Sequence, residues 1–145
     1  MVAFEQVLEY LREIHPRTVP LDADRAMLTL YLVDWKAAID LRRPVSNLEW
    51  RIEHLPQPTA RQREVMLSAF KHGATCELAG NVNGMTSEDR AIIQDIVSRV
   101  GHKSDTELLR LVYSTFPVLS QPRHAPINLV AMADKYKREY RDSIR

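Results

Sequence analysis

The 145-residue sequence contains a single cysteine, Cys76, and only four glycines. One cysteine excludes an intramolecular disulfide, which fits a reducing compartment, so we expect a cytoplasmic protein. The scarcity of glycine leaves no Gly-rich loop of the kind that cradles phosphate groups. No apolar stretch approaches the roughly 20 residues of a membrane-spanning helix. Residues 1–9 also lack the basic start and apolar run of a secretion signal, so we expect no membrane association.

An excess of charge of one sign is also missing. The chain carries 20 basic and 19 acidic residues, so no overall field draws it toward nucleic acid. The one basic run, residues 135–141, interleaves Lys and Arg with Tyr136 and Tyr140, a pattern that can also contact phosphates and stack on bases. We favour a core role for the two tyrosines, because they continue the helical stripe of Leu129, Met132 and Ala133.

Hydrophobic periodicity predicts six helices, over residues 3–14, 22–41, 59–72, 86–100, 104–114 and 128–140. The last five begin at residues that can cap a helix N-terminus, namely Asp22, Thr59, Thr86, Ser104 and Asn128. The helix over residues 22–41 is apolar around a wide arc, which predicts that it lies at the centre of the fold. The prolines at positions 117, 122 and 126 predict a loop before the last helix.

The hydrophobic period changes after Pro44. Residues 48–54 alternate apolar and charged side chains, which is typical of a half-buried strand, and residues 55–58 end it. Residues 75–78, followed by the turn signal at 83–84, are the expected partner strand. The sequence therefore predicts one α+β domain over residues 1–145, predominantly helical, with about six helices and a small β-hairpin or strand pair.

No combination of residues points to catalysis, a metal or a cofactor. His72 and Cys76 are four residues apart, but Gly73 is expected to end the helix between them. Cys76 is more typical of a small apolar filler than of a nucleophile. Asp34 lies beside Trp35 on the most apolar helix, and we expect it to be partly buried and bonded to backbone or to an arginine, with a functional acid as the less favoured alternative. We predict a protein that is not an enzyme, with a small enzyme whose pocket escapes recognition as the alternative.

Several segments resemble the Panacea domain, the SocA-like antitoxin family found in bacteria and phages and also known as a domain of unknown function. The resemblance begins with residues 30–38 and 46–50 and covers about residues 24–140. The helix openings at 86–89 and 104–108 follow in the same order, and Leu111–Pro117 is the most specific string. One segment departs from the family: many members have Tyr-Gly-Pro where this chain has His54–Pro58, which predicts a different turn.

The resemblance implies a compact, mainly helical domain that neutralises a toxin by direct binding. Some relatives are thought to be adaptors that deliver a toxin to a AAA+ protease, and a phage protein that blocks a host factor is a further alternative. Family members bind very different toxins, so the resemblance does not identify the partner. It also supplies no catalytic residues.

The charged face of the predicted strand supplies the candidate partner contacts. Glu49, Arg51 and Glu53 lie opposite the apolar face of the strand, and Arg42 and Arg43 lie in the turn before it. Arginine is enriched at protein interfaces. For each residue the alternative is an ordinary solvated charge. The large aromatic residues are instead expected in the scaffold, by their periodicity: Tyr31, Trp35, Trp50 and Tyr113.

Overall fold

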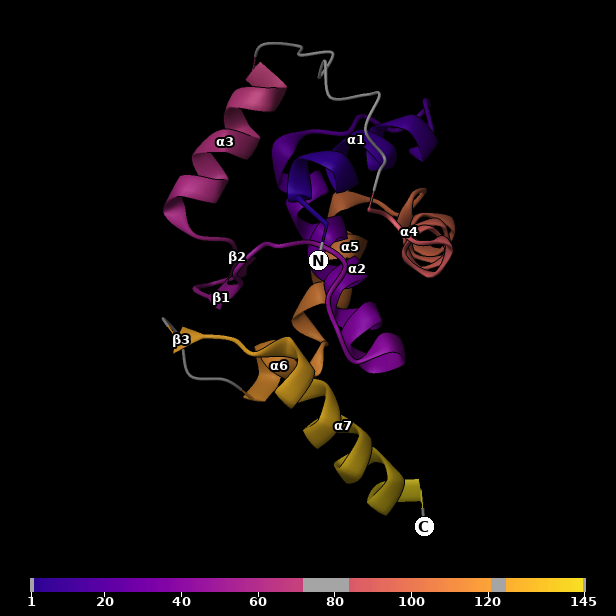
Figure 1. Ribbon diagram of the computed structural model, residues 1–145, viewed down its shortest axis with the longest axis vertical. Helices are drawn as coiled ribbons and strands as arrows, with labels where there is room; N and C mark the ends of the chain where they lie inside the picture. Colours follow the sequence, from indigo (N-terminus) through magenta and orange to yellow (C-terminus); the bar gives the residue numbers. More distant parts are fainter. Residues whose placement is uncertain (1, 72–83, 121–124, 145) are drawn as a thin grey trace.

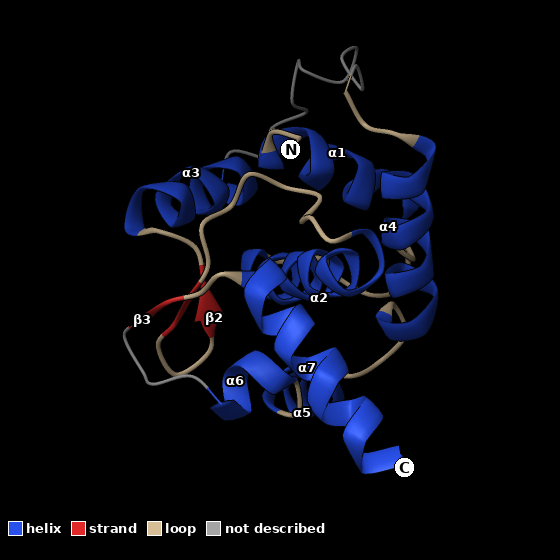
Figure 2. Ribbon diagram, turned by 60° about the horizontal axis from the view of Figure 1, so that its bottom comes forward, coloured by secondary structure: helices blue, strands red, loops and turns tan. Residues whose placement is uncertain are grey.

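Helix α2, Ala23–Leu41, lies at the centre of the computed structural model, which describes residues 2–71, 84–120 and 125–144. The other helices in these ranges are α1 (Phe4–Ile14), α3 (Ala60–Lys71), α4 (Ser87–Val100), α5 (Asp105–Tyr113), α6 (Phe116–Ser120) and α7 (Leu129–Ile144) (Figure 1). Figure 2 shows α2 enclosed by helices on several sides, and α1, α3, α4, α5 and α7 all contact it. Its wide apolar arc is therefore buried, as predicted, and the fold is predominantly helical α+β. None of the described helices has the length and apolar character needed to cross a bilayer.

The helix starts follow the predicted caps. Asp22 accepts a hydrogen bond from the Arg25 backbone N–H at 2.8 Å. Thr86 and Asp89 form a reciprocal capping box, with the Asp89 N–H bonded to the Thr86 side chain and the Thr86 N–H to the Asp89 carboxylate. The side chain of Asn128 likewise accepts from the Ala131 N–H at 3.0 Å. These bonds satisfy backbone donors that a helix leaves unpaired at its start.

The described sheet has three strands where a strand pair was predicted, and each strand is shorter than expected. Strand β1, Arg51–Ile52, lies between β2, Pro56–Gln57, and β3, Ala125–Pro126, and is antiparallel to both. The predicted strand over 48–54 is thus reduced to two residues. The alternation in burial is nevertheless present, because Leu48 and Trp50 are buried and Glu49 is exposed. The expected partner strand at 75–78 lies outside the described residues.

Two prolines explain part of this difference. From the sequence, Pro56 is expected to end a strand and Pro126 to lie in a loop, because proline has no N–H to donate to a strand ladder. Both lie in outer strands of the sheet as described, where a missing N–H is tolerated.

The region before α7 contains two further corrections. Residues 116–120 form α6 although a loop was predicted, and Pro117 is its second residue, where a helix tolerates proline because the N–H would have no helical partner. Tyr113 was predicted to be in the scaffold but is 45% exposed. Val112 takes the buried position on α5, and one residue turns a helix by about 100°.

A buried carboxylate attaches the segment after α2 to the core. Asp34 is 0% exposed and accepts hydrogen bonds from the backbone N–H groups of Val45 and Ser46, at 3.0 and 2.9 Å. It also accepts from the Ser46 hydroxyl and from the Trp50 indole N–H, the latter at 2.8 Å. Asp34 is therefore bonded to backbone, as expected, but it is fully buried, and its hydrogen-bond donors among the described residues are Val45, Ser46 and Trp50 in place of an arginine. The Trp50 ring packs edge-on against Tyr31, with centroids 5.5 Å apart.

We predict that Asp34 makes the stability of the protein depend on pH. Burial raises the pKa of Asp34 to about 6, and the hydrogen bonds from Ser46, Trp50 and Val45 oppose the rise without cancelling it. A raised folded-state pKa contributes stability that is present below the unfolded pKa and is lost as pH rises through the folded value. Relative to Asp34→Asn, the wild type should therefore lose on the order of 3 kcal/mol of unfolding free energy between about pH 4 and pH 7. Urea unfolding of both proteins measures this, and a difference that stays constant with pH would contradict it.

A buried arginine donates hydrogen bonds to carbonyl groups at and after the end of α4. Arg25 donates to the carbonyl oxygens of Val100, Gly101 and Lys103 and forms an ion pair with Asp105 at 2.9 Å. These carbonyls follow or end the helix and lack helical partners. Arg25 therefore joins the start of α2 to the α4–α5 connection.

We predict that Arg25→Met lowers the free energy of unfolding by about 2–4 kcal/mol, because it removes the arginine donor from the carbonyl groups of Gly101 and Lys103. The Val100 carbonyl keeps its hydrogen bond from the Lys103 N–H. The control is Asp105→Asn, which should cost less than about 1 kcal/mol, since the Asp105 side chain is 79% exposed. Chemical denaturation of the two variants tests the assignment. Equal losses would show that the ion pair, not the carbonyl contacts, is the main contribution.

Candidate partner-binding groove

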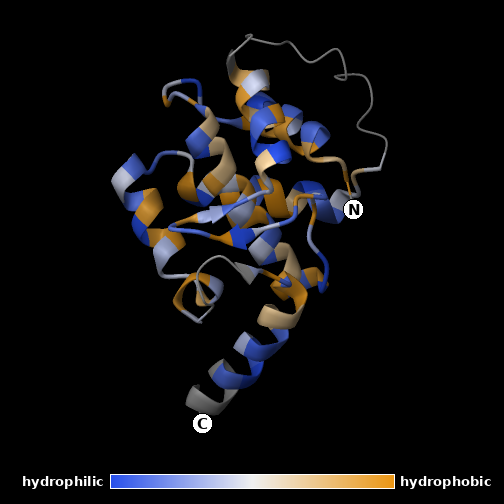
Figure 3. Ribbon diagram, turned by 90° about the vertical axis from the view of Figure 1, so that its left-hand side faces the viewer, coloured by the Kyte–Doolittle hydropathy of each residue, from blue (hydrophilic) through white to orange (hydrophobic). Residues whose placement is uncertain are grey.

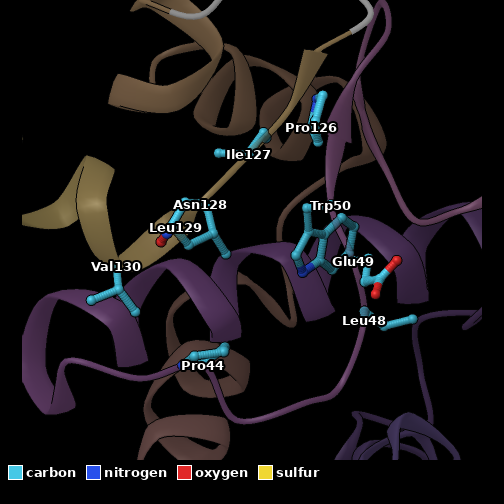
Figure 4. A pocket seen from close by; sticks show the side chains of 9 residues that line it. All are labelled: Pro44, Leu48, Glu49, Trp50, Pro126, Ile127, Asn128, Leu129 and Val130. Atoms are coloured by element: carbon cyan, nitrogen blue, oxygen red, sulfur yellow. The ribbon is translucent and has the colours of Figure 1, made fainter.

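A groove of about 340 Å³ lies between the segment that follows α2 and the start of α7 (Figure 4). We call it the partner groove. Buried side chains form its floor: Leu48, Trp50 and Leu129. Partly buried and exposed residues form its walls: Pro44, Glu49, Pro126, Ile127, Asn128 and Val130. The described lining is thus mainly apolar, and Glu49 is the one ionisable residue in it.

Interactions between distant parts of the chain hold the two walls in place. The Ile127 N–H donates to the Trp50 carbonyl oxygen at 2.9 Å, which continues the pairing of β3 with β1. Trp50 is held from below by Asp34 at 2.8 Å. Asn128 caps α7 and so fixes where Leu129 and Val130 begin the helix. The groove is therefore bounded by hydrogen-bonded backbone on both sides, which is typical of a preformed site.

Glu49 marks one end of the partner groove. Its backbone N–H donates to the side-chain oxygen of Gln62 at 3.1 Å, which fixes its position. Its carboxylate has no hydrogen-bond or ion-pair partner within the described residues. Figure 4 shows Glu49 and Leu48 at one end of the groove and Val130 with Pro44 at the other. An unpaired acid beside an apolar floor favours an apolar side chain with a neighbouring basic group.

The structure does not bring the five predicted contacts together. Glu49 lines the partner groove. Arg51, on β1, and Glu53, just after β1, lie beside the groove, and the Arg51 Nε is 3.9 Å from the Glu53 Oε1. Arg43 pairs with the buried carboxylate of Asp89 at 2.7 Å, so it helps to hold the start of α4.

Arg42 lies outside the partner groove. Its side chain is 71% exposed and its Nη2 lies 3.4 Å from an Asp134 carboxylate oxygen on α7.

Sequence reasoning missed the wall formed by residues 126–130. Asn128 was recognised as a helix cap, but nothing local showed that Ile127 would lie against Trp50. The only available signal was the apolar pair on either side of Asn128, Ile127 and Leu129, which a capped helix start alone does not require.

The chemistry of the partner groove suits side-chain insertion. Within the described ranges, no three His, Cys, Asp or Glu side chains are grouped so that they could hold a metal ion. The adjoining outer strand β3 contains Pro126, which has no N–H to donate to an added strand. A partner would therefore be recognised through apolar side chains and Glu49, not by extension of the sheet.

No family model, curated protein or solved structure matches this chain. The assignment to the Panacea family therefore remains a prediction from the sequence resemblance.

Proposed function

We propose that this chain is a non-catalytic protein-binding module of the Panacea type, an antitoxin that neutralises a toxin by direct contact. The observation that carries the proposal is the preformed apolar groove with an unpaired carboxylate at its end. Its occupant would be an apolar side chain of the toxin with a lysine or arginine beside it. The family resemblance in the sequence supports the same class of function.

The size of the groove is consistent with an anchor site within a larger interface. A volume of about 340 Å³ holds only a few side chains, whereas a stable protein interface buries roughly 800 Å² on each partner. Binding energy at such interfaces is concentrated in a few anchor residues seated in well-packed pockets. The exposed surface of α7 next to the groove would supply part of the remaining area.

We predict that Val130→Asp weakens the complex by about 10- to 100-fold, because it places a charge where an apolar anchor is desolvated. The chain is co-expressed with the product of its adjacent open reading frame, and growth rescue, co-purification and affinity are measured. Val65→Asp is the matched control, since Val65 is an apolar residue on α3, is 43% exposed and does not line the groove. Binding that survives Val130→Asp but not Val65→Asp would move the interface to α3 and reject the groove.

A second variant tests the charge at the groove end. Glu49→Lys should slow association and lower affinity by about 3- to 10-fold, with the loss shrinking as salt is added. The double exchange Arg51→Glu with Glu53→Lys is the control, because it keeps an opposite-charge pair beside the groove. We expect it to bind nearly as the wild type does. If the double exchange lowers affinity more than Glu49→Lys does, the contact surface is the outer face of β1.

A further inference from the structure

A basic cavity of about 420 Å³ lies where the end of α2 meets α7. Its lining consists of Arg42, Asp134, Lys137 and Arg138. Asp134 is engaged by Arg42 at 3.4 Å. Lys137 and Arg138 have no ion-pair or hydrogen-bond partner within the described residues. Among the described lining residues, three cations and one carboxylate therefore leave an excess of two positive charges.

The basic cavity continues the partner groove along both of its walls. Arg42 precedes the groove residue Pro44 by two positions, in the same turn. Asp134 follows the groove residue Val130 by four positions, so the two lie on one face of α7. Figure 3 shows α7 changing along its length from hydrophobic to hydrophilic residues. A single extended segment of a partner can thus lie across the apolar groove and reach the cations.

The backbone of Arg42 is a second observation. It ends α2 with φ 59° and ψ 27°, the left-handed conformation. Glycine is the usual residue at such a helix end, because a Cβ is disfavoured there. The guanidinium is mostly exposed and its ion pair with Asp134 is a surface contact, which adds little stability. The fold therefore gives little reason for an arginine at this position, whereas a binding role does.

We infer that the basic cavity binds an acidic segment of the partner, next to the apolar anchor in the partner groove. This inference rests on the proposed function and adds the partner's charge pattern: a basic group at the Glu49 end, an apolar anchor, then carboxylates. Carboxylates fit better than nucleic-acid phosphates. Asp134 lies among the cations, the chain has a net charge of only +1, and the one aromatic residue of the neighbouring groove, Trp50, is buried in its floor.

The test uses a synthetic peptide, a leucine followed by six glutamates, titrated into the full-length ¹⁵N-labelled protein at low salt. We expect the amide signals of residues 42 and 134–138 to shift. Lys137→Glu with Arg138→Glu should weaken binding about tenfold or more, and Arg42→Gly about threefold, with Val65→Asp unchanged. Arg42→Gly should also keep or raise the Tm, which separates a loss of binding from a loss of folding.

Other outcomes overturn the inference. One is that a leucine–hexalysine peptide binds as tightly as the leucine–hexaglutamate peptide. Another is that the charge variants bind the glutamate peptide with the affinity of the wild type. A third is that a twelve-nucleotide thymidine strand binds the same residues more tightly than the glutamate peptide does. The assay needs no toxin, so its result is separate from the growth-rescue test. Rescue that depends on Val130 but not on Lys137 and Arg138 would leave the proposed function standing and remove the acidic segment.

Discussion

The burial of the Asp34 carboxylate is the constraint on which the rest of the structure depends. A fully buried acid needs donors around it, and the chain supplies them from one short segment, at Val45, Ser46 and Trp50. That segment is therefore held against α2. The hydrogen bonds of Asp34 therefore also help to position the elements that bond to residues 45–50.

Two distant parts of the chain use this segment as their attachment. Near the N-terminus, the Val2 N–H donates to the Val45 carbonyl at 2.8 Å, and the Asn47 N–H donates to the Val2 carbonyl at 2.9 Å. Near the start of α7, Ile127 donates to Trp50. One buried carboxylate thus organises contacts that join the start of the sequence, residues 45–50 and the C-terminal third. The partner groove lies at the last of these contacts.

The parts of the fold that the sequence predicts are those decided by neighbouring residues. The caps at Asp22, Thr86 and Asn128 act within three residues of themselves, so their chemistry is visible locally. The sheet is different, because β1 pairs with β3 across more than seventy residues and each strand has only two. Such short strands carry almost no periodic signal, and their pairing is set by tertiary contacts.

The candidate site divides in the same way. Alternation along residues 48–52 correctly indicated that Glu49 would be exposed beside buried Leu48 and Trp50. It could not show that Arg43 would be bound to a buried acid on α4, because the two residues are 46 positions apart. The apolar wall of the groove was missed for the same reason. Charge patterns locate surfaces, but long-range packing decides which surfaces become concave.

Pro126, in the outer strand beside the partner groove, has a consequence for how recognition can change. Recognition through backbone hydrogen bonds accepts many sequences, because all residues except proline share the same donors and acceptors. Recognition through side chains depends on the few residues that line the groove. Under the proposed function, substitutions at wall positions such as Ile127 and Val130 would redirect binding without removing the hydrogen bonds of Asp34. Under this function, side chains of the walls could thus change with the partner, whereas the floor residue Trp50 is held by its hydrogen bond to Asp34.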